Sequence, residues 1–213
     1  MASENREDYL KSIFMLSAEK NRAVRTKELA QALEVSSASV TEMVGKLAKE
    51  GFLENEPYYG FSLTKKGILG AFRVLRKHRL LERFLVETLG LPKTEVHAEA
   101  HRLEHVVSDE SLDRIDCLLK SPCYCPHNSR IPCKDSNVLG LGDLKPGSKA
   151  RIVFSKLKAG NTLDRLNSMG LVPEAEITVL RKLRKGPIII KVKGSEIALD
   201  KNIASQFYVE VFR

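Results

Sequence analysis

Histidine and glutamate residues recur in the middle of the sequence at spacings that place them together on helix faces. Three imidazoles and one carboxylate share one side of a single helical wheel: His97, His101, Glu104 and His105. On an earlier predicted helix, His78 and Glu82 are four residues apart and therefore neighbours on one face. Imidazole and carboxylate ligands suit Mn, Fe, Co, Ni and Zn better than Mg or Ca, and facing helices with such pairs can build paired metal sites. The pattern favours metal binding over a solvated polar face.

A second group of metal-capable residues follows in a proline-containing stretch. All five histidines and all four cysteines fall between residues 78 and 133, and this stretch holds a thiol and imidazole cluster: Cys123, Cys125, His127 and Cys133. The cluster could form a second metal site or hold a redox cluster. Its spacing is not that of a standard zinc finger, so reduced thiols in a loop are the alternative. Without a visible secretion signal, a disulfide framework is not expected.

The elements before these residues follow the order of a winged helix-turn-helix. Hydrophobic periodicity predicts three helices and two short strands: residues 4–20, a helix beginning at Thr26, and residues 38–50, 52–56 and 61–63. We expect Thr26 to cap the second helix, Ser36 or Ser37 to cap the third, and Gly51 to end it. Helices, a turn and a tight hairpin in this order are typical of DNA-binding domains.

The remaining chain divides into a helical part and a β-rich part. Helices are predicted over 64–89, 94–107 and 109–120, an irregular loop over 121–138, and then β-type segments with one short helix over 162–169. The predicted fold is α+β, with a winged helix-turn-helix domain (1–75), a helical domain that carries the metal-capable residues and the Cys-rich loop (76–138) and an SH3-like small β-barrel (139–213).

The residues expected to contact DNA lie at the starts of two helices, along the third helix and at the hairpin tip. They are Arg25, Thr26, Lys27, Ser36, Ser37, Ala38, Ser39, Thr41, Lys46, Tyr58 and Tyr59. Short polar side chains at the start of a recognition helix allow close approach to base edges, whereas basic side chains beside them suit phosphate contacts. The serine that caps the recognition helix has an equally good structural role.

The segment RKHRLLERFLVETLGLPKTEVHAEAHRLEHVVSDE (76–110), with the winged helix before it, resembles the diphtheria-toxin-repressor family of metal-dependent transcriptional regulators. The resemblance extends to about residue 135. The last 75 residues, with GDLKPGSKARIV and LNSMGLVPEAEITVL, resemble the SH3-like domain of the ferrous-iron-transport accessory type. The resemblance implies a homodimeric repressor that binds a double-stranded DNA operator and controls metal-homeostasis genes. Fe²⁺ or Mn²⁺ would be its corepressor, with Co²⁺, Ni²⁺ or Zn²⁺ able to replace it in vitro.

Position by position, the resemblance implies two metal sites. Site 1 consists of His78, Glu82 and His97, and site 2 of Asp8, His101, Glu104 and His105. Iron-type members have Cys and Met where this chain has His101 and Asp8, and manganese-type members have Glu and Asp there. Manganese-type members also have a glutamate in place of Lys11. Asp8 therefore leans toward manganese, whereas His101 fits neither subgroup.

Charge alone is a poor guide to the DNA-binding region. The formal net charge is +8, yet residues 1–75 carry 11 Lys and Arg against ten Asp and Glu, and residues 139–213 carry 14 against seven. No apolar run is long enough to span a bilayer and no signal peptide is visible, so we expect a cytoplasmic protein without membrane contact. Two alternatives are a metalloenzyme and an SH3-like regulator of an iron transporter. With no HExxH motif or conventional nucleophile, we expect neither an enzyme nor a small-molecule substrate.

Overall fold

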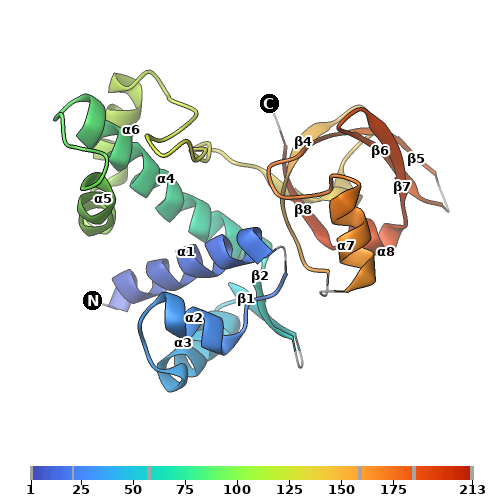
Figure 1. Ribbon diagram of the computed structural model, residues 1–213, viewed down its shortest axis with the longest axis horizontal. Helices are drawn as coiled ribbons and strands as arrows, with labels where there is room; N and C mark the ends of the chain where they lie inside the picture. Colours follow the sequence, from blue (N-terminus) through green and yellow to red (C-terminus); the bar gives the residue numbers. More distant parts are fainter. Residues whose placement is uncertain (1, 21, 57–58, 158–159, 184–185, 212–213) are drawn as a thin grey trace. The chain divides into compact units, whose positions relative to one another are not determined.

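The computed structural model describes residues 2–20, 22–56, 59–157, 160–183 and 186–211 (Figure 1). The chain forms two compact units. One contains residues 1–11 and 69–136, and the other contains residues 12–68 and 137–213. None of the described helices is both long and apolar enough to cross a membrane.

The first unit is helical. It contains the first part of α1 (Ala2–Lys20), most of α4 (Lys65–Glu87), α5 (Val96–Glu104) and α6 (Asp109–Leu118). Leu81 and Leu85 of α4 pack with Val96 and Ala100 of α5, all of them buried. This apolar seam fixes the two helices side by side, so that the polar residues flanking it on each helix come together.

The loop after α6 is tied to the same unit by buried contacts. Cys125 and Ile131 pack with Leu80 of α4 and with α6. Arg76 donates hydrogen bonds to the carbonyl of Pro132 (3.1 Å) and to Asp116 (2.6 Å). The stretch therefore lacks regular structure but has a fixed place against α4.

In the second unit, α2 (Thr26–Ala32), α3 (Ser37–Lys49), β1 (Leu53–Glu56) and β2 (Gly60–Leu63) form the winged helix, and their order confirms the prediction. The expected cap at Thr26 is wrong: Arg25 is the N-cap, because Glu28 at the third helical position accepts from its backbone N–H at 3.0 Å. Ser36 caps α3 and accepts from the backbone of Ser39 at 3.1 Å.

Gly60 allows the hairpin to lie directly against the segment before α2. Its φ is +118°, and a Cβ there would lie 2.1 Å from the carbonyl oxygen of Val24. That close approach lets Phe61 form a two-way backbone bridge with Val24. The wing is thus joined directly to the segment before α2.

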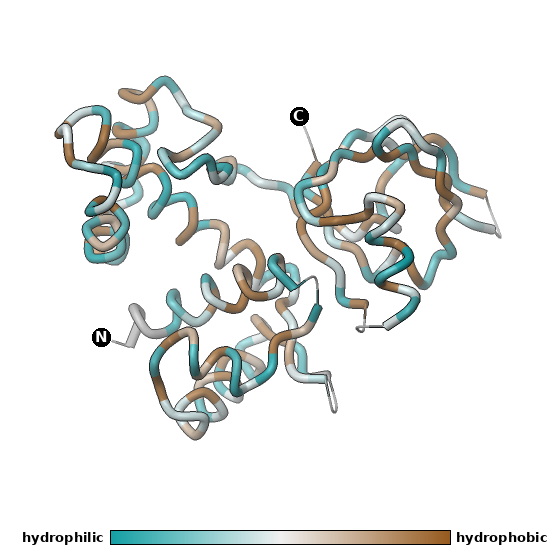
Figure 2. Tube along the Cα trace, in the orientation of Figure 1, coloured by the Kyte–Doolittle hydropathy of each residue, from teal (hydrophilic) through white to brown (hydrophobic). Residues whose placement is uncertain are grey.

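The C-terminal part is a six-stranded antiparallel sheet in the order β3-β8-β4-β5-β6-β7. The strands are β3 (Val138–Gly140), β4 (Lys149–Ser155), β5 (Glu176–Lys182), β6 (Ile188–Val192), β7 (Ser195–Leu199) and β8 (Phe207–Val211). The helical segments are η1 (Leu141–Asp143), α7 (Asn161–Ser168) and α8 (Lys201–Ala204). Figure 2 shows hydrophobic and hydrophilic residues alternating along the strands, and the apolar side chains form one core.

The SH3-like domain differs from the expected barrel in its closure. The sheet is strongly curled (Figure 1), but its outer strands, β3 and β7, are not paired with each other within the described part of the chain. It is therefore an open sheet. Strand β3 and the short helices η1 and α8 were not predicted, because three or four residues give too little periodicity to detect.

Candidate metal centre

Site 1 is assembled by α4 and α5. The Nε2 atom of His78 lies 3.0 Å from Nδ1 of His97 and 3.2 Å from Oε1 of Glu82. Nδ1 of His97 also lies 3.1 Å from Oε1 of Glu82. His78 and Glu82 are buried, whereas the His97 side chain is 72% exposed. Three donor atoms thus converge at a place that solvent can reach from one side.

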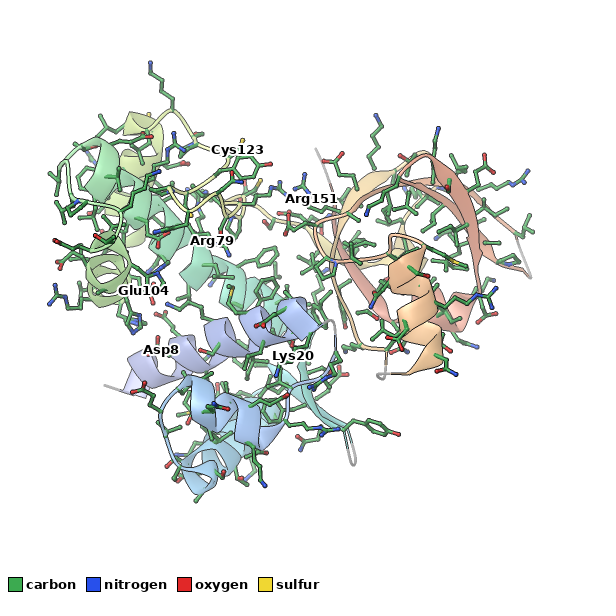
Figure 3. The ribbon with its side chains drawn as sticks, in the orientation of Figure 1. Asp8, Lys20, Arg79, Glu104, Cys123 and Arg151 are labelled. Atoms are coloured by element: carbon green, nitrogen blue, oxygen red, sulfur yellow. The ribbon has the colours of Figure 1, made fainter. Side chains whose placement is uncertain are left out.

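Site 2 is assembled by α1 and α5. Figure 3 marks Asp8 on α1 and Glu104 at the end of α5. Oε1 of Glu104 lies 2.8 Å from Nδ1 of His101 and 3.4 Å from Nε2 of His105. Oδ1 of Asp8 lies 3.2 Å from the same Nε2 of His105 and 3.8 Å from Nδ1 of His101. His105 follows the last residue of α5 but keeps helical dihedral angles, so its ring stays on the same face.

Two buried atoms of site 2 have the character of unused metal ligands. Oδ1 of Asp8 and Nε2 of His105 have no hydrogen-bond partner among the residues that the structure describes. The other ring nitrogen of His105, Nδ1, lies 2.9 Å from Oε2 of Glu7. This contact orients the His105 ring and turns Nε2 toward Asp8, as in metal sites where a carboxylate orients a ligating histidine. The donor set fits a divalent transition metal.

Glu104 belongs to site 2 and is hydrogen-bonded to His78 of site 1. Its carboxylate is fully buried; Oε1 faces site 2, and Oε2 accepts a hydrogen bond from Nδ1 of His78 at 2.6 Å. The opposite ring nitrogen of that histidine faces site 1. One carboxylate and one imidazole therefore connect the two groups of ligands.

Charges in the centre favour the ionised form of its two glutamates. Burial opposes ionisation of Glu104, but the hydrogen bond from His78 and the positive charge of Lys11 outweigh it and lower the Glu104 pKa to about 2. Burial likewise opposes ionisation of Glu82, and hydrogen bonds from two histidines lower its pKa to about 2. At Asp8 burial prevails and raises the pKa. For His78, burial is outweighed by hydrogen bonds to the two glutamates, which raise its pKa.

The Cys-rich loop contributes differently from the predicted cluster. Cys125 and His127 come together with Glu82, and the donor atoms of the three residues lie within 4.8 Å of one another. Nδ1 of His127 is 3.2 Å from Oε1 of Glu82, and burial raises the pKa of the Cys125 thiol. Cys123 and Cys133 are exposed and belong to none of the donor groups found in the described ranges. The loop thus places two residues beside site 1 instead of forming a four-residue site of its own.

Most of the described residues expected to contact DNA are exposed. Arg25, Lys27, Ser37, Ala38, Thr41 and Tyr59 are exposed, Thr26 is half-buried, and Tyr58 lies outside the described residues. Ser36 and Ser39 share the cap hydrogen bonds of α3, and Lys46 pairs with Glu42 at 2.7 Å. The polar start of α3 and the basic start of α2 are therefore both exposed.

Three contacts of the centre were missed in the sequence. Glu7 orients His105, Lys11 pairs with Glu104, and Glu82 is shared with the Cys-rich loop. Glu7 and Lys11 are beside Asp8 or one turn away on α1, so the helical wheel offered a signal for both. The loop contact depends on packing between distant segments, for which the sequence has no local sign.

The chain matches three family models in succession. Residues 1–61 match the N-terminal DNA-binding domain of iron-dependent repressors, residues 64–133 match their metal-binding and dimerisation domain, and residues 139–211 match the FeoA domain.

Known proteins show the same likeness. This chain is 33% identical to the iron-dependent repressor IdeR of Mycobacterium tuberculosis over 96% of both chains. It is 40% identical to the transcriptional regulator MntR of Shouchella clausii over 56% of this chain and 82% of that one. Its fold is similar to the solved structure of ScaR with bound Zn²⁺, at a TM-score of 0.56 and 36% identity over 98% of this chain and all of that one. The chain therefore belongs to the family of iron-dependent repressors, the metal-dependent DNA-binding regulators of transcription.

Proposed function

We propose that a divalent metal ion, Fe²⁺ or Mn²⁺, acts as corepressor by fixing the DNA-binding heads of a homodimer for operator binding in the cytoplasm. One observation supports this most directly. Helix α1 is continuous over Ala2–Lys20, and its first eleven residues belong to the unit that contains the ligands, whereas the rest belong to the unit that contains α2 and α3. A metal ion bound to Asp8 would therefore be attached to a helix that continues into the unit with α2 and α3.

The proposed ligands of site 2 come from two helices, α1 and α5. Oδ1 of Asp8 and Nε2 of His105 are buried without a hydrogen-bond partner in the described part of the chain, and Glu104 adds an ionised carboxylate oxygen. A bound divalent cation supplies the positive charge that attracts all three at once. The residues of α1 and α5 are then held at one separation, so the metal-bound chain samples fewer orientations of its DNA-binding head.

Site 1 supports the same centre from the side of α4. We propose that His78, Glu82 and His97 hold a second ion there and that Cys125 and His127 extend this site through Glu82. The hydrogen bond from His78 to Glu104 would transmit its occupancy to site 2. We propose domain boundaries of 1–75, 76–138 and 139–213, with Asp8 as the one ligand that comes from the first of these domains.

The donor types favour divalent transition metals. Two histidines and two carboxylates at site 2 are borderline to hard ligands that accept Fe²⁺ and Mn²⁺ and that also bind Co²⁺, Ni²⁺ and Zn²⁺. Relatives are named for iron or manganese dependence or were solved with Zn²⁺ or Cd²⁺. We propose that DNA and a second copy of the chain are its partners, and that it is a regulator and not an enzyme.

The test is DNA binding under controlled metal. Duplexes selected from a random pool at saturating Mn²⁺ serve as the probe, and fluorescence anisotropy measures their affinity under anaerobic conditions with a chelator, with Mn²⁺ or with Fe²⁺. We expect metal to tighten binding at least tenfold, and Asp8→Ala or His105→Ala to abolish that gain. Glu19→Ala removes an exposed carboxylate from the same helix and is the matched control. Equal affinity with chelator and with metal would show the proposal to be wrong.

A further inference from the structure

Lys11 lies at the centre of site 2 although it cannot bind a metal. It follows Asp8 by three residues on α1, and therefore lies about one turn further along the same face. Its ammonium contacts Oε1 of Glu104 in an ion pair and lies 3.4 Å from Nδ1 of His101. The side chain is only 16% exposed. The positive charge is thus enclosed among the ligands instead of extending into solvent.

The two atoms that Lys11 contacts are the same atoms that site 2 offers to a metal ion. Oε1 of Glu104 and Nδ1 of His101 belong to the group of donor atoms that converges with Asp8 and His105. An ammonium has three N–H donors and no lone pair to give, so it uses acceptor atoms without adding a ligand. An ammonium and a divalent ion at such short range also repel each other.

We propose that Lys11 is an internal cation of site 2, and that a divalent ion binds there only by displacing the Lys11 ammonium from Glu104 and His101. This inference rests on the proposed function, because it concerns the regulation of the same site. In one arrangement Lys11 joins α1 directly to α5. In the other, Asp8 joins the two helices through the metal ion. The two residues are on the same helix, so the exchange moves one attachment of α1 from the turn of Lys11 to the turn of Asp8, where Glu7 already contacts His105.

The competition sets the metal concentration at which site 2 fills. The free energy of the ion pair between Lys11 and Glu104 is subtracted from metal binding, which raises the dissociation constant. The site then responds to higher free metal than the same ligands would without the lysine.

The first experiment measures Mn²⁺ binding without DNA. A chain with His97→Ala and His127→Ala weakens site 1 and its neighbour, so that the titration reports site 2. Free Mn²⁺ is followed by its electron paramagnetic resonance signal. Lys11→Met in this background keeps the length of the side chain and removes the charge, and we expect Mn²⁺ to bind about tenfold more tightly. Lys11→Arg should bind as the parent does, and Lys134→Met, which removes an exposed lysine charge of the same unit, is the matched control.

The second experiment needs no change to the site. Lysine carrying ¹³C at its ε carbon gives one signal per side chain, and Lys11→Arg identifies the signal of Lys11. Saturation with diamagnetic Zn²⁺ should move that signal to the position of a solvated lysine. An unchanged Lys11 signal at saturation, or Mn²⁺ binding that Lys11→Met leaves equal or weaker, overturns the proposal.

Both experiments stand apart from the test of function. If DNA binding is metal-dependent but Lys11→Met does not change the Mn²⁺ affinity, the internal cation alone is wrong. If Lys11→Met tightens Mn²⁺ binding but DNA binding ignores metal, the proposed function alone is wrong.

Discussion

Acid should lower the free energy of unfolding of the metal-free protein mainly because it protonates the buried carboxylates of the metal centre. Glu104 has a pKa of about 2 against the usual 4.5, so its ionised form is stabilised by the fold. Because its pKa is about 2 in the folded chain and 4.5 in the unfolded chain, Glu104 adds about 3 kcal/mol to the free energy of unfolding at neutral pH. Because the folded-state pKa is lowered, this contribution is complete above pH 4.5 to 5 and is lost as the pH falls toward 2. By pH 3 the loss is about 2 kcal/mol.

Glu104→Gln tests this reasoning. The variant lacks the ionised group, so it should be less stable than the parent at pH 7 by about 3 kcal/mol and should approach the parent's stability as the pH falls to 3. The assay is urea unfolding in the presence of a chelator, followed by circular dichroism at 222 nm, at pH 7, 5, 4 and 3. Glu99→Gln, on the same helix but in a surface pair with Arg102, is the control and should change stability by less than about 0.5 kcal/mol.

Parallel curves would refute the argument. If Glu104→Gln loses as much stability between pH 5 and pH 3 as the parent does, the carboxylate is not held ionised by its neighbours. Glu82 has the same lowered pKa and the same partner, His78, so the double variant should lose less than the sum of the two single variants.

Three further outcomes follow from the contacts described above. Glu7→Ala releases His105 and should weaken Mn²⁺ binding at site 2 about tenfold in a titration, whereas Glu19→Ala should not. Gly60→Ala would place a Cβ against the carbonyl of Val24 and should lower the free energy of unfolding by about 2 kcal/mol or more in urea; unchanged stability would contradict the observed bridge. Mn²⁺ at 100 times its dissociation constant should stabilise the chain by about 2.7 kcal/mol per site, seen as a higher melting temperature, and His105→Ala should remove the share of site 2.

Much of the helical fold could be predicted from the sequence because its signals are local. The third helix was expected over 38–50 and is found at Ser37–Lys49, since Ser36 caps it and Gly51 follows it with φ of +77°. Thr26 was wrongly taken as a cap because Glu28 can serve the backbone of Arg25 from within the helix. A glutamate at the third helical position can be recognised as a partner of the N-cap backbone only once the first helical residue is known.

The centre itself could be predicted only in part. The periodicity of 3.6 residues brought His101, Glu104 and His105 to one face, but it gave no sign that Glu104 would reach His78, 26 residues earlier. The position of Cys125 beside Glu82 likewise depends on a cluster of buried residues from α4, α6 and the loop. Such contacts depend on tertiary packing between distant segments, and no local pattern in a single sequence predicts them.

The continuity of α1 has a mechanical consequence. From Asp8 to Lys20 the helix rises by about 18 Å at 1.5 Å per residue. A helix of this length is stiff, so a rotation of its first part by about 5° would carry its far end by roughly 1.6 Å. If metal binding at Asp8 turned the helix by that angle, its far end would move by about the distance that separates a hydrogen bond made from a hydrogen bond lost.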